Sequence, residues 1–188
     1  MRVDTWSYDA CYKPATTAVR RAVTSGPNLL HLALIALALP CVRFTLNEAR
    51  HRALPRLRLY APPLLAVACA VVFLGIDLGA KAPLWRVGLL AVAGFAMGAI
   101  RGFTLRLEVD HDFQKVRLPR ARGSFMIALA LLGAVLLEVG GAFAGEPATA
   151  LRQLASEIAV ACAAMLTGRA LAIRVRWNRA PYVNLRRA

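Results

Sequence analysis

The distribution of apolar residues divides the chain into five long hydrophobic stretches separated by charged segments. A helix needs about 20 apolar residues to cross the roughly 30 Å hydrocarbon core of a bilayer, so each stretch predicts a transmembrane helix. The first stretch is the least regular, because Pro40 is expected to kink it and Arg43 has to extend its charge to the membrane surface. The five expected helices cover residues 29–46, 60–79, 87–103, 124–144 and 151–173.

A polar segment between the third and fourth stretches has a different pattern. Apolar and polar residues alternate here, with Leu105, Leu107 and Val109 on one face. The sequence DHDFQ at 110–114 supplies turn chemistry before the alternation resumes. Residues 104–119 are therefore expected to form a two-stranded β-hairpin.

The basic residues predict an orientation for these helices. Segments 42–59, 101–122 and 169–188 carry seventeen Lys and Arg residues, whereas the two remaining loops carry three. Cytoplasmic loops are enriched in Lys and Arg, so the hairpin and the C-terminus are expected in the cytoplasm and the N-terminus outside. Residues 1–28 carry four basic residues against this rule. Either this segment lies on the outer surface, or the first span does not cross fully.

The overall composition agrees with a membrane location. The chain is 59% hydrophobic, with a mean hydropathy of +0.53 and a formal net charge of +14, a combination that soluble domains seldom show. The predicted fold class is an all-α integral membrane protein with five transmembrane helices and a short cytoplasmic β-hairpin between helices 3 and 4. Residues 29–173 form one membrane domain, residues 1–28 an outside or interfacial extension, and residues 174–188 a basic cytoplasmic tail.

The high positive charge raises the question of nucleic-acid binding, which the positions of the charges argue against. The cations lie between apolar stretches, and no known nucleic-acid module is visible in the basic tail. The expected partners are the lipid bilayer and other membrane proteins. The bias toward Ala, Leu and Arg suggests the inner membrane of a bacterium.

Several segments of this chain resemble the CcdC family of small bacterial multi-span membrane proteins associated with cytochrome c biogenesis, together with its uncharacterised relatives. The matching segments are LYAPPLL at 59–65, VGLLAVAGFAMGAIRGF running into TLRLEVDHDFQKVRLPRARGSF at 87–125, and LTGRALAIRVRW at 166–177. The resemblance covers the chain from residue 43 onward. It implies a multi-span protein connected with cytochrome c maturation, and it supplies no catalytic residues.

Three glycines in the third stretch form a candidate helix-packing stripe. Gly94, Gly98 and Gly102 are spaced four apart, so they lie on one helix face and allow a neighbouring helix to approach closely. The neighbour is either another helix of this chain or a helix of a second chain.

A second candidate site combines ionisable residues near the outer leaflet. At 1.5 Å per residue, Asp77 and Glu138 reach the outer side of their helices, and Glu157 and His31 lie at a similar depth. Ionisable groups inside a membrane mark proton transfer, metal or haem contact, or partner docking, and near the interface they also serve as structural ion pairs. The spacing within each helix gives no metal-ligand set. The expected outer-leaflet polar cluster comprises His31, Asp77, Glu138, Glu157, Arg86 and Arg152.

Two of the four cysteines form a redox hypothesis. Cys69 and Cys162 both lie near the middle of expected spans, where they could meet as an intramembrane dithiol. A buried thiol in apolar surroundings is usually inert, and no adjacent motif supports redox chemistry.

The leading functional hypothesis is a non-catalytic accessory or assembly protein for a larger membrane complex, in cytochrome c maturation if the resemblance holds. One alternative is a small permanent subunit of a respiratory or photosynthetic complex that contacts haem or pigment through His31. Another alternative is a transmembrane thiol-redox carrier that uses Cys69 and Cys162. No catalytic residue is assigned, and no bound cofactor is expected.

Overall fold

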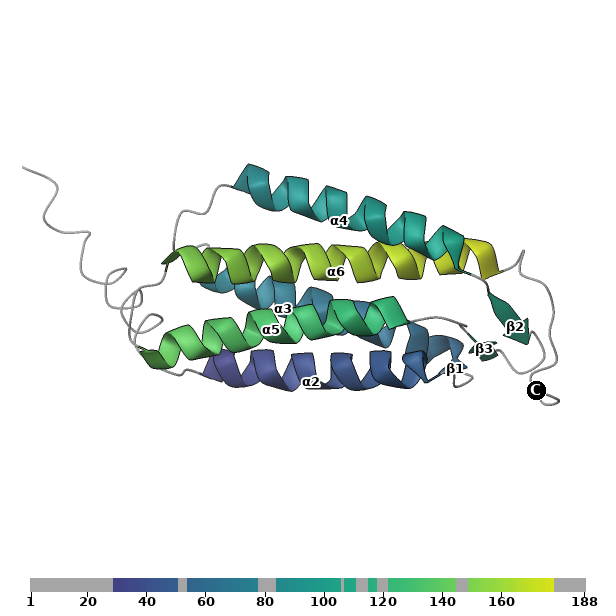
Figure 1. Cartoon of the computed structure of the whole chain (residues 1–188), viewed down its shortest axis with the longest axis horizontal. Helices are drawn as coiled ribbons and strands as arrows, with labels where there is room; N and C mark the ends of the chain where they lie inside the picture. Colours follow the sequence, from purple (N-terminus) through teal and green to yellow (C-terminus); the bar gives the residue numbers. More distant parts are fainter. Residues whose placement is uncertain are drawn as a thin grey trace, which may run out of the picture.

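Five α-helices lie side by side and alternate in direction in the described part of the chain (Figure 1). The computed structural model describes residues 29–50, 54–77, 84–105, 107–110, 115–117, 122–144 and 149–177. The helices are α2 (Leu29–Ala49), α3 (Ala61–Asp77), α4 (Leu84–Thr104), α5 (Arg122–Ala144) and α6 (Thr149–Trp177). A 3₁₀-helix, η2 (Arg56–Leu59), precedes α3. The expected extension at 1–28 lies outside the described residues, whereas α6 continues into the segment expected as a basic tail.

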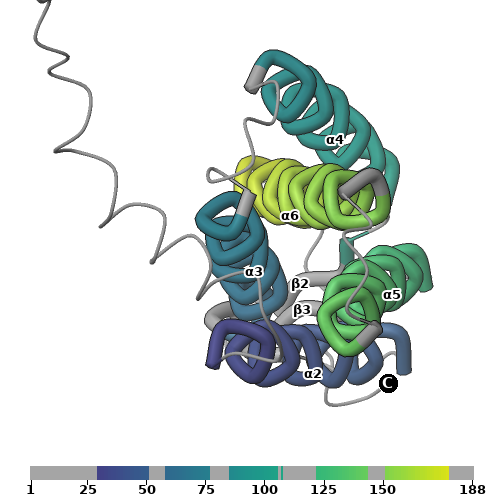
Figure 2. The backbone as a smooth tube through the Cα atoms, turned by 90° about the vertical axis from the view of Figure 1, so that its left-hand side faces the viewer, coloured from purple at the N-terminus to yellow at the C-terminus, as the bar shows by residue number. Residues whose placement is uncertain are grey.

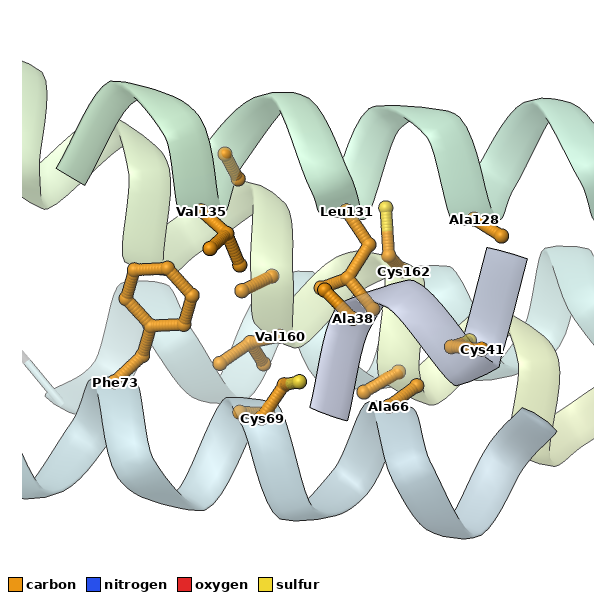
Figure 3. Close-up of a cluster of buried hydrophobic side chains, with 14 of the residues drawn as sticks. Ala38, Cys41, Ala66, Cys69, Phe73, Ala128, Leu131, Val135, Val160 and Cys162 are labelled. Carbon is orange, nitrogen blue, oxygen red and sulfur yellow. The ribbon is translucent and has the colours of Figure 1, made fainter. Parts of the chain in front are cut away.

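Four of the helices enclose a common core, and the remaining one lies outside it. Viewed along the bundle, α2 and α6 are diagonal to each other, with α3 and α5 between them, and α4 packs on the outer side of α6 (Figure 2). The core between the four helices is built largely from small side chains, so that the helix backbones approach closely. Its bulkiest fully buried members include Leu34, and also Phe73 and Leu131, which are shown in Figure 3.

The expectation of five transmembrane helices is wrong because α3 is too short. Within the described residues, α2, α4, α5 and α6 are long and apolar enough to cross a membrane. Helix α3 has 17 residues, or about 25 Å at 1.5 Å per residue. Helix α3 is shorter than the apolar stretch at 60–79. At its start it is preceded by η2 and a bend at Tyr60, and at its other end it stops at Asp77. Four helices of this kind agree with a multi-pass protein embedded in a membrane.

The expectation of a two-stranded hairpin at 104–119 is also wrong. Helix α4 continues to Thr104, so the alternation of residues after 104 does not begin in a strand. The strands β2 (Glu108–Asp110) and β3 (Lys115–Arg117) have three residues each. They belong to a three-stranded sheet in the order β1-β3-β2, in which β1 (Leu54–Pro55) follows α2.

The long-range pairing of β1 explains why the local pattern misled. Val116 lies opposite Val109 on one side and Leu54 on the other, in antiparallel register. A two-stranded hairpin is marginal by itself in water, and the third strand comes from a segment about 60 residues earlier in the sequence. The strands lie at one end of the bundle (Figure 1). We call this the sheet end.

Candidate polar site in the helix bundle

A buried ion pair joins α2 and α6 across the core at the sheet end. The guanidinium of Arg169 donates two hydrogen bonds to the carboxylate of Glu48, and the Nη1 to Oε2 distance is 3.3 Å. The two side chains are only 6% and 4% exposed. A bidentate pair of this kind is directional as well as charge-assisted. It therefore fixes the spacing of two helices that are diagonal to each other in the bundle.

Two hydroxyl side chains are also buried toward the sheet end. Thr45 lies one turn before Glu48, and its hydroxyl donates to the carbonyl oxygens of Cys41 and Val42 at 3.0 and 2.9 Å. These bonds satisfy the Thr45 hydroxyl within its own helix, in the turn after Pro40. Ser124, in the first turn of α5, is also buried at the sheet end, and its hydroxyl has no hydrogen-bond partner among the described residues.

Arg176 forms a second polar contact at the sheet end. Its Nη1 lies 3.0, 2.7 and 2.7 Å from the carbonyl oxygens of Gly102, Phe103 and Leu105. The last carbonyls of a helix have no partner within the helix. Arg176 of α6 therefore caps the C-terminus of α4 and complements the negative end of its dipole.

Two members of the expected outer-leaflet cluster contact each other. Glu138 and Arg152 form an ion pair, with 3.6 Å between Oε1 and Nε, and link α5 to α6 at the end opposite the sheet. Glu138 is buried, whereas the Arg152 side chain is 22% exposed. Glu157 accepts a hydrogen bond from Gln153, four residues earlier in α6, at 3.2 Å.

The remaining expected members of this cluster are His31, Arg86 and Asp77. His31 is buried in the first turn of α2. Arg86 is exposed on α4, where its guanidinium carbon lies 5.4 Å from the ring centre of its neighbour Trp85. The side chain of Asp77 lies outside the described residues. Of the expected cluster, the described residues therefore establish the ion pair between Glu138 and Arg152, which joins two helices.

The glycine stripe of α4 packs against α6 of the same chain. A Cβ added to Gly94 would lie 2.7 Å from the Ala161 carbonyl oxygen, and one added to Gly98 would lie 2.0 Å from that of Met165. Gly102 similarly faces Arg169 and Ala172. Of the two alternatives for the neighbouring helix, the structure shows the one within the chain.

One glycine of this interface was missed at the sequence level. A Cβ on Gly168 would lie 2.2 Å from the carbonyl oxygen of Phe95. Both helices therefore contribute glycine, which allows backbone-to-backbone contact. Gly168 stands alone in its helix sequence, so no repeated spacing marked it.

The two cysteines of the redox hypothesis lie in the same buried cluster, together with a third. Cys69 of α3, Cys162 of α6 and Cys41 of α2 all belong to the core (Figure 3), and all three are free thiols. The Cys41 thiol donates to the carbonyl of Pro62 at 3.6 Å, and that of Cys69 to the carbonyl of Leu34 at 4.0 Å. The described residues contain no group of three His, Cys, Asp or Glu side chains arranged to hold a metal ion.

Sequence reasoning also missed the Glu48–Arg169 pair. Glu48 follows the first apolar stretch, and Arg169 is one of the basic residues at the expected cytoplasmic boundary. Each of the two charges lies within one or two turns of the end of an apolar helix. A charge at such a position needs an opposite charge to neutralise it, and this could have indicated the pair. A comparison with known protein families, curated proteins and solved structures found no match.

Proposed function

We propose that this protein is a non-catalytic accessory or assembly protein of a larger membrane complex. The observation that carries the proposal is the position of α4. Among the described elements, this helix makes its extensive contact with α6 alone, and it lies outside the four-helix core (Figure 2).

The face of α4 opposite the glycine stripe is apolar and exposed. Its large side chains recur at helical spacing, so they form one stripe directed away from α6. Each is between 52% and 69% exposed. This α4 stripe comprises Trp85, Leu89, Val92, Ile100 and Phe103.

A stripe of this kind suits packing against a helix of another membrane protein. Helices associate in a bilayer mainly through van der Waals packing, and aromatic side chains supply much of the contact energy at protein interfaces. The core of this chain closes without the α4 stripe. The buried charges Glu48 and Arg169 hold each other within the chain, which suits a structural role better than a catalytic one.

The sequence supports the partner class and the membrane location that belong to this proposal. The basic segments support a cytoplasmic sheet end in a bacterial inner membrane, and the resemblance to the CcdC family supports a complex of cytochrome c maturation. Both are parts of the proposal, and the identity of the captured partner tests the second.

Site-specific photocrosslinking in living cells tests the proposal. A photoreactive amino acid is placed at Val92 or Ile100 on the α4 stripe, and at Leu136 on α5 as a matched control. Leu136 is also exposed and apolar. We expect both α4 positions to capture the same membrane protein, identified by mass spectrometry, and Leu136 to capture none. The absence of a common adduct at Val92 and Ile100, or the same adduct at Leu136, contradicts the proposal.

A further inference from the structure

A groove between α3 and α6 opens at the sheet end. It encloses a cavity of about 320 Å³. One wall comes from the start of α3 and the other from the second half of α6, two helices that pack against each other. The lining residues are Tyr60, Pro63, Leu64, Val67, Thr167, Ala170, Leu171 and Arg174.

The groove exists because small or rigid residues form its floor. Pro63 and Ala170 are buried there, and neither side chain is long enough to fill the space between the two helices. Leu64, Val67 and Leu171 form its exposed rims. These rims face the surroundings of the bundle, which for apolar side chains on a membrane helix is the lipid.

The interior of the groove offers no unsatisfied polar group to a ligand. Its one hydroxyl on α6, that of Thr167, donates to the carbonyl oxygen of Ala163 at 2.7 Å. The interior of the groove is therefore suited to a hydrocarbon chain, because an apolar chain bound there deprives no polar group of its hydrogen bond.

The mouth of the groove is cationic and aromatic. Arg174 lies two turns beyond Thr167 on α6, toward the sheet end, and its side chain is exposed. Tyr60 lies across from it at the start of α3, and the exposed Arg58 precedes Tyr60 by two residues. Arginine binds phosphate with good geometry, and tyrosine prefers the headgroup region of a bilayer.

We propose that this groove binds one anionic phospholipid, with an acyl chain between α3 and α6 and the headgroup phosphate against Arg174. The groove is apolar inside and carries a cation at its mouth, at the membrane interface. A lipid molecule matches this order, with an apolar acyl chain followed by a headgroup phosphate. A zwitterionic lipid has no net charge for Arg174 to attract, and so it binds the same groove more weakly. This proposal stands independently of the accessory function.

Native mass spectrometry of the purified protein in detergent tests the inference. The protein is titrated with an equimolar mixture of phosphatidylglycerol and phosphatidylcholine that carry identical acyl chains. We expect the first bound lipid to be phosphatidylglycerol, with a preference that falls about fivefold in Arg174→Ala, as expected for one cation near an anionic lipid. Arg174→Lys, which keeps the charge, should retain most of the preference.

Two further variants separate the groove from general charge effects. Arg122→Ala removes an exposed arginine at the same end of the bundle, on α5, and should leave the preference unchanged. Val67→Trp fills the groove from an exposed rim position and should lower the occupancy of both lipids, and Leu171→Trp repeats this test from the facing helix. The inference is overturned if the wild type shows no preference, if Arg122→Ala acts like Arg174→Ala, or if both groove-filling variants keep the bound lipid.

Discussion

Arg169 and Glu48 form a buried, bidentate ion pair although 121 positions separate them in the chain. The pair links α2 to α6, whose backbones are diagonal to each other in the bundle (Figure 2). Each charge is buried only because the other neutralises it, so the pair reports on the correct assembly of the first and last described helices. The contribution of this ion pair to the stability of the fold can be measured directly.

Removing one partner of the pair should destabilise the fold strongly. Glu48→Ala leaves the Arg169 charge buried without its carboxylate, and a broken buried ion pair lowers the free energy of unfolding by about 3–5 kcal/mol. Unfolding by denaturing detergent, followed by circular dichroism, measures the loss. Glu157→Ala is the control, because Glu157 is only half-buried. The double variant Glu48→Leu with Arg169→Met should recover much of the stability. A double variant no more stable than Glu48→Ala would contradict this account.

Gly98→Ala should disrupt the contact between α4 and α6. The new Cβ would lie 2.0 Å from the Met165 carbonyl oxygen, so the two backbones have to separate. We expect the free energy of unfolding to fall by about 1–3 kcal/mol, as in overpacked cores. Gly88→Ala is the matched control on the same helix, since nothing lies within 4 Å of its added Cβ. It should stabilise the protein by about 0.4–1 kcal/mol. Equal effects of the two substitutions would show that α4 does not pack as described.

Arg176→Ala should loosen the end of α4. Three carbonyl oxygens then lose a charged donor, and each hydrogen bond to a charged group contributes about 1.5–3 kcal/mol. Hydrogen exchange measured by mass spectrometry should become faster in the last turn of α4 and stay unchanged in α5. Arg174→Ala, two residues earlier in the same helix, should leave exchange in α4 as it is. Unchanged exchange in Arg176→Ala would exclude the capping role.

The three core thiols should resist alkylation until the protein unfolds. Cys41, Cys69 and Cys162 are all buried, so a permeant maleimide should react with none of them in the folded protein in detergent. Cys11 lies outside the described residues and is replaced by serine for this measurement. Leu136→Cys provides an exposed thiol that should react within minutes. Rapid alkylation of Cys69 or Cys162 in the folded state would instead support the dithiol hypothesis, by showing that reagents reach these thiols.

The proposed orientation predicts opposite labelling at the two ends of the bundle. Arg50→Cys places a thiol at the sheet end, and Arg86→Cys places one near the other end. With Cys11 replaced by serine, a membrane-impermeant thiol reagent added outside intact cells should label Arg86→Cys. It should label Arg50→Cys only after lysis. The reverse pattern would place the sheet end outside the cytoplasm.

The sequence alone determined the helical, membrane-embedded character of this protein. Apolar stretches long enough to span a bilayer leave few alternatives to a helix, because backbone hydrogen bonds have to be satisfied within each segment. The same local logic marked the glycine stripe at Gly94, Gly98 and Gly102, since spacing by four fixes a helix face.

The tertiary structure decided what those faces contact. The third strand beside Val116, the partner of Glu48 and the cap that Arg176 provides all come from segments far apart in the sequence, and no local period encodes such pairings. The prediction of a hairpin with only two strands was wrong for that reason, because it used only neighbouring residues. A charge near a helix end shows that it needs a partner, and only the packing of the helices determines which residue supplies it.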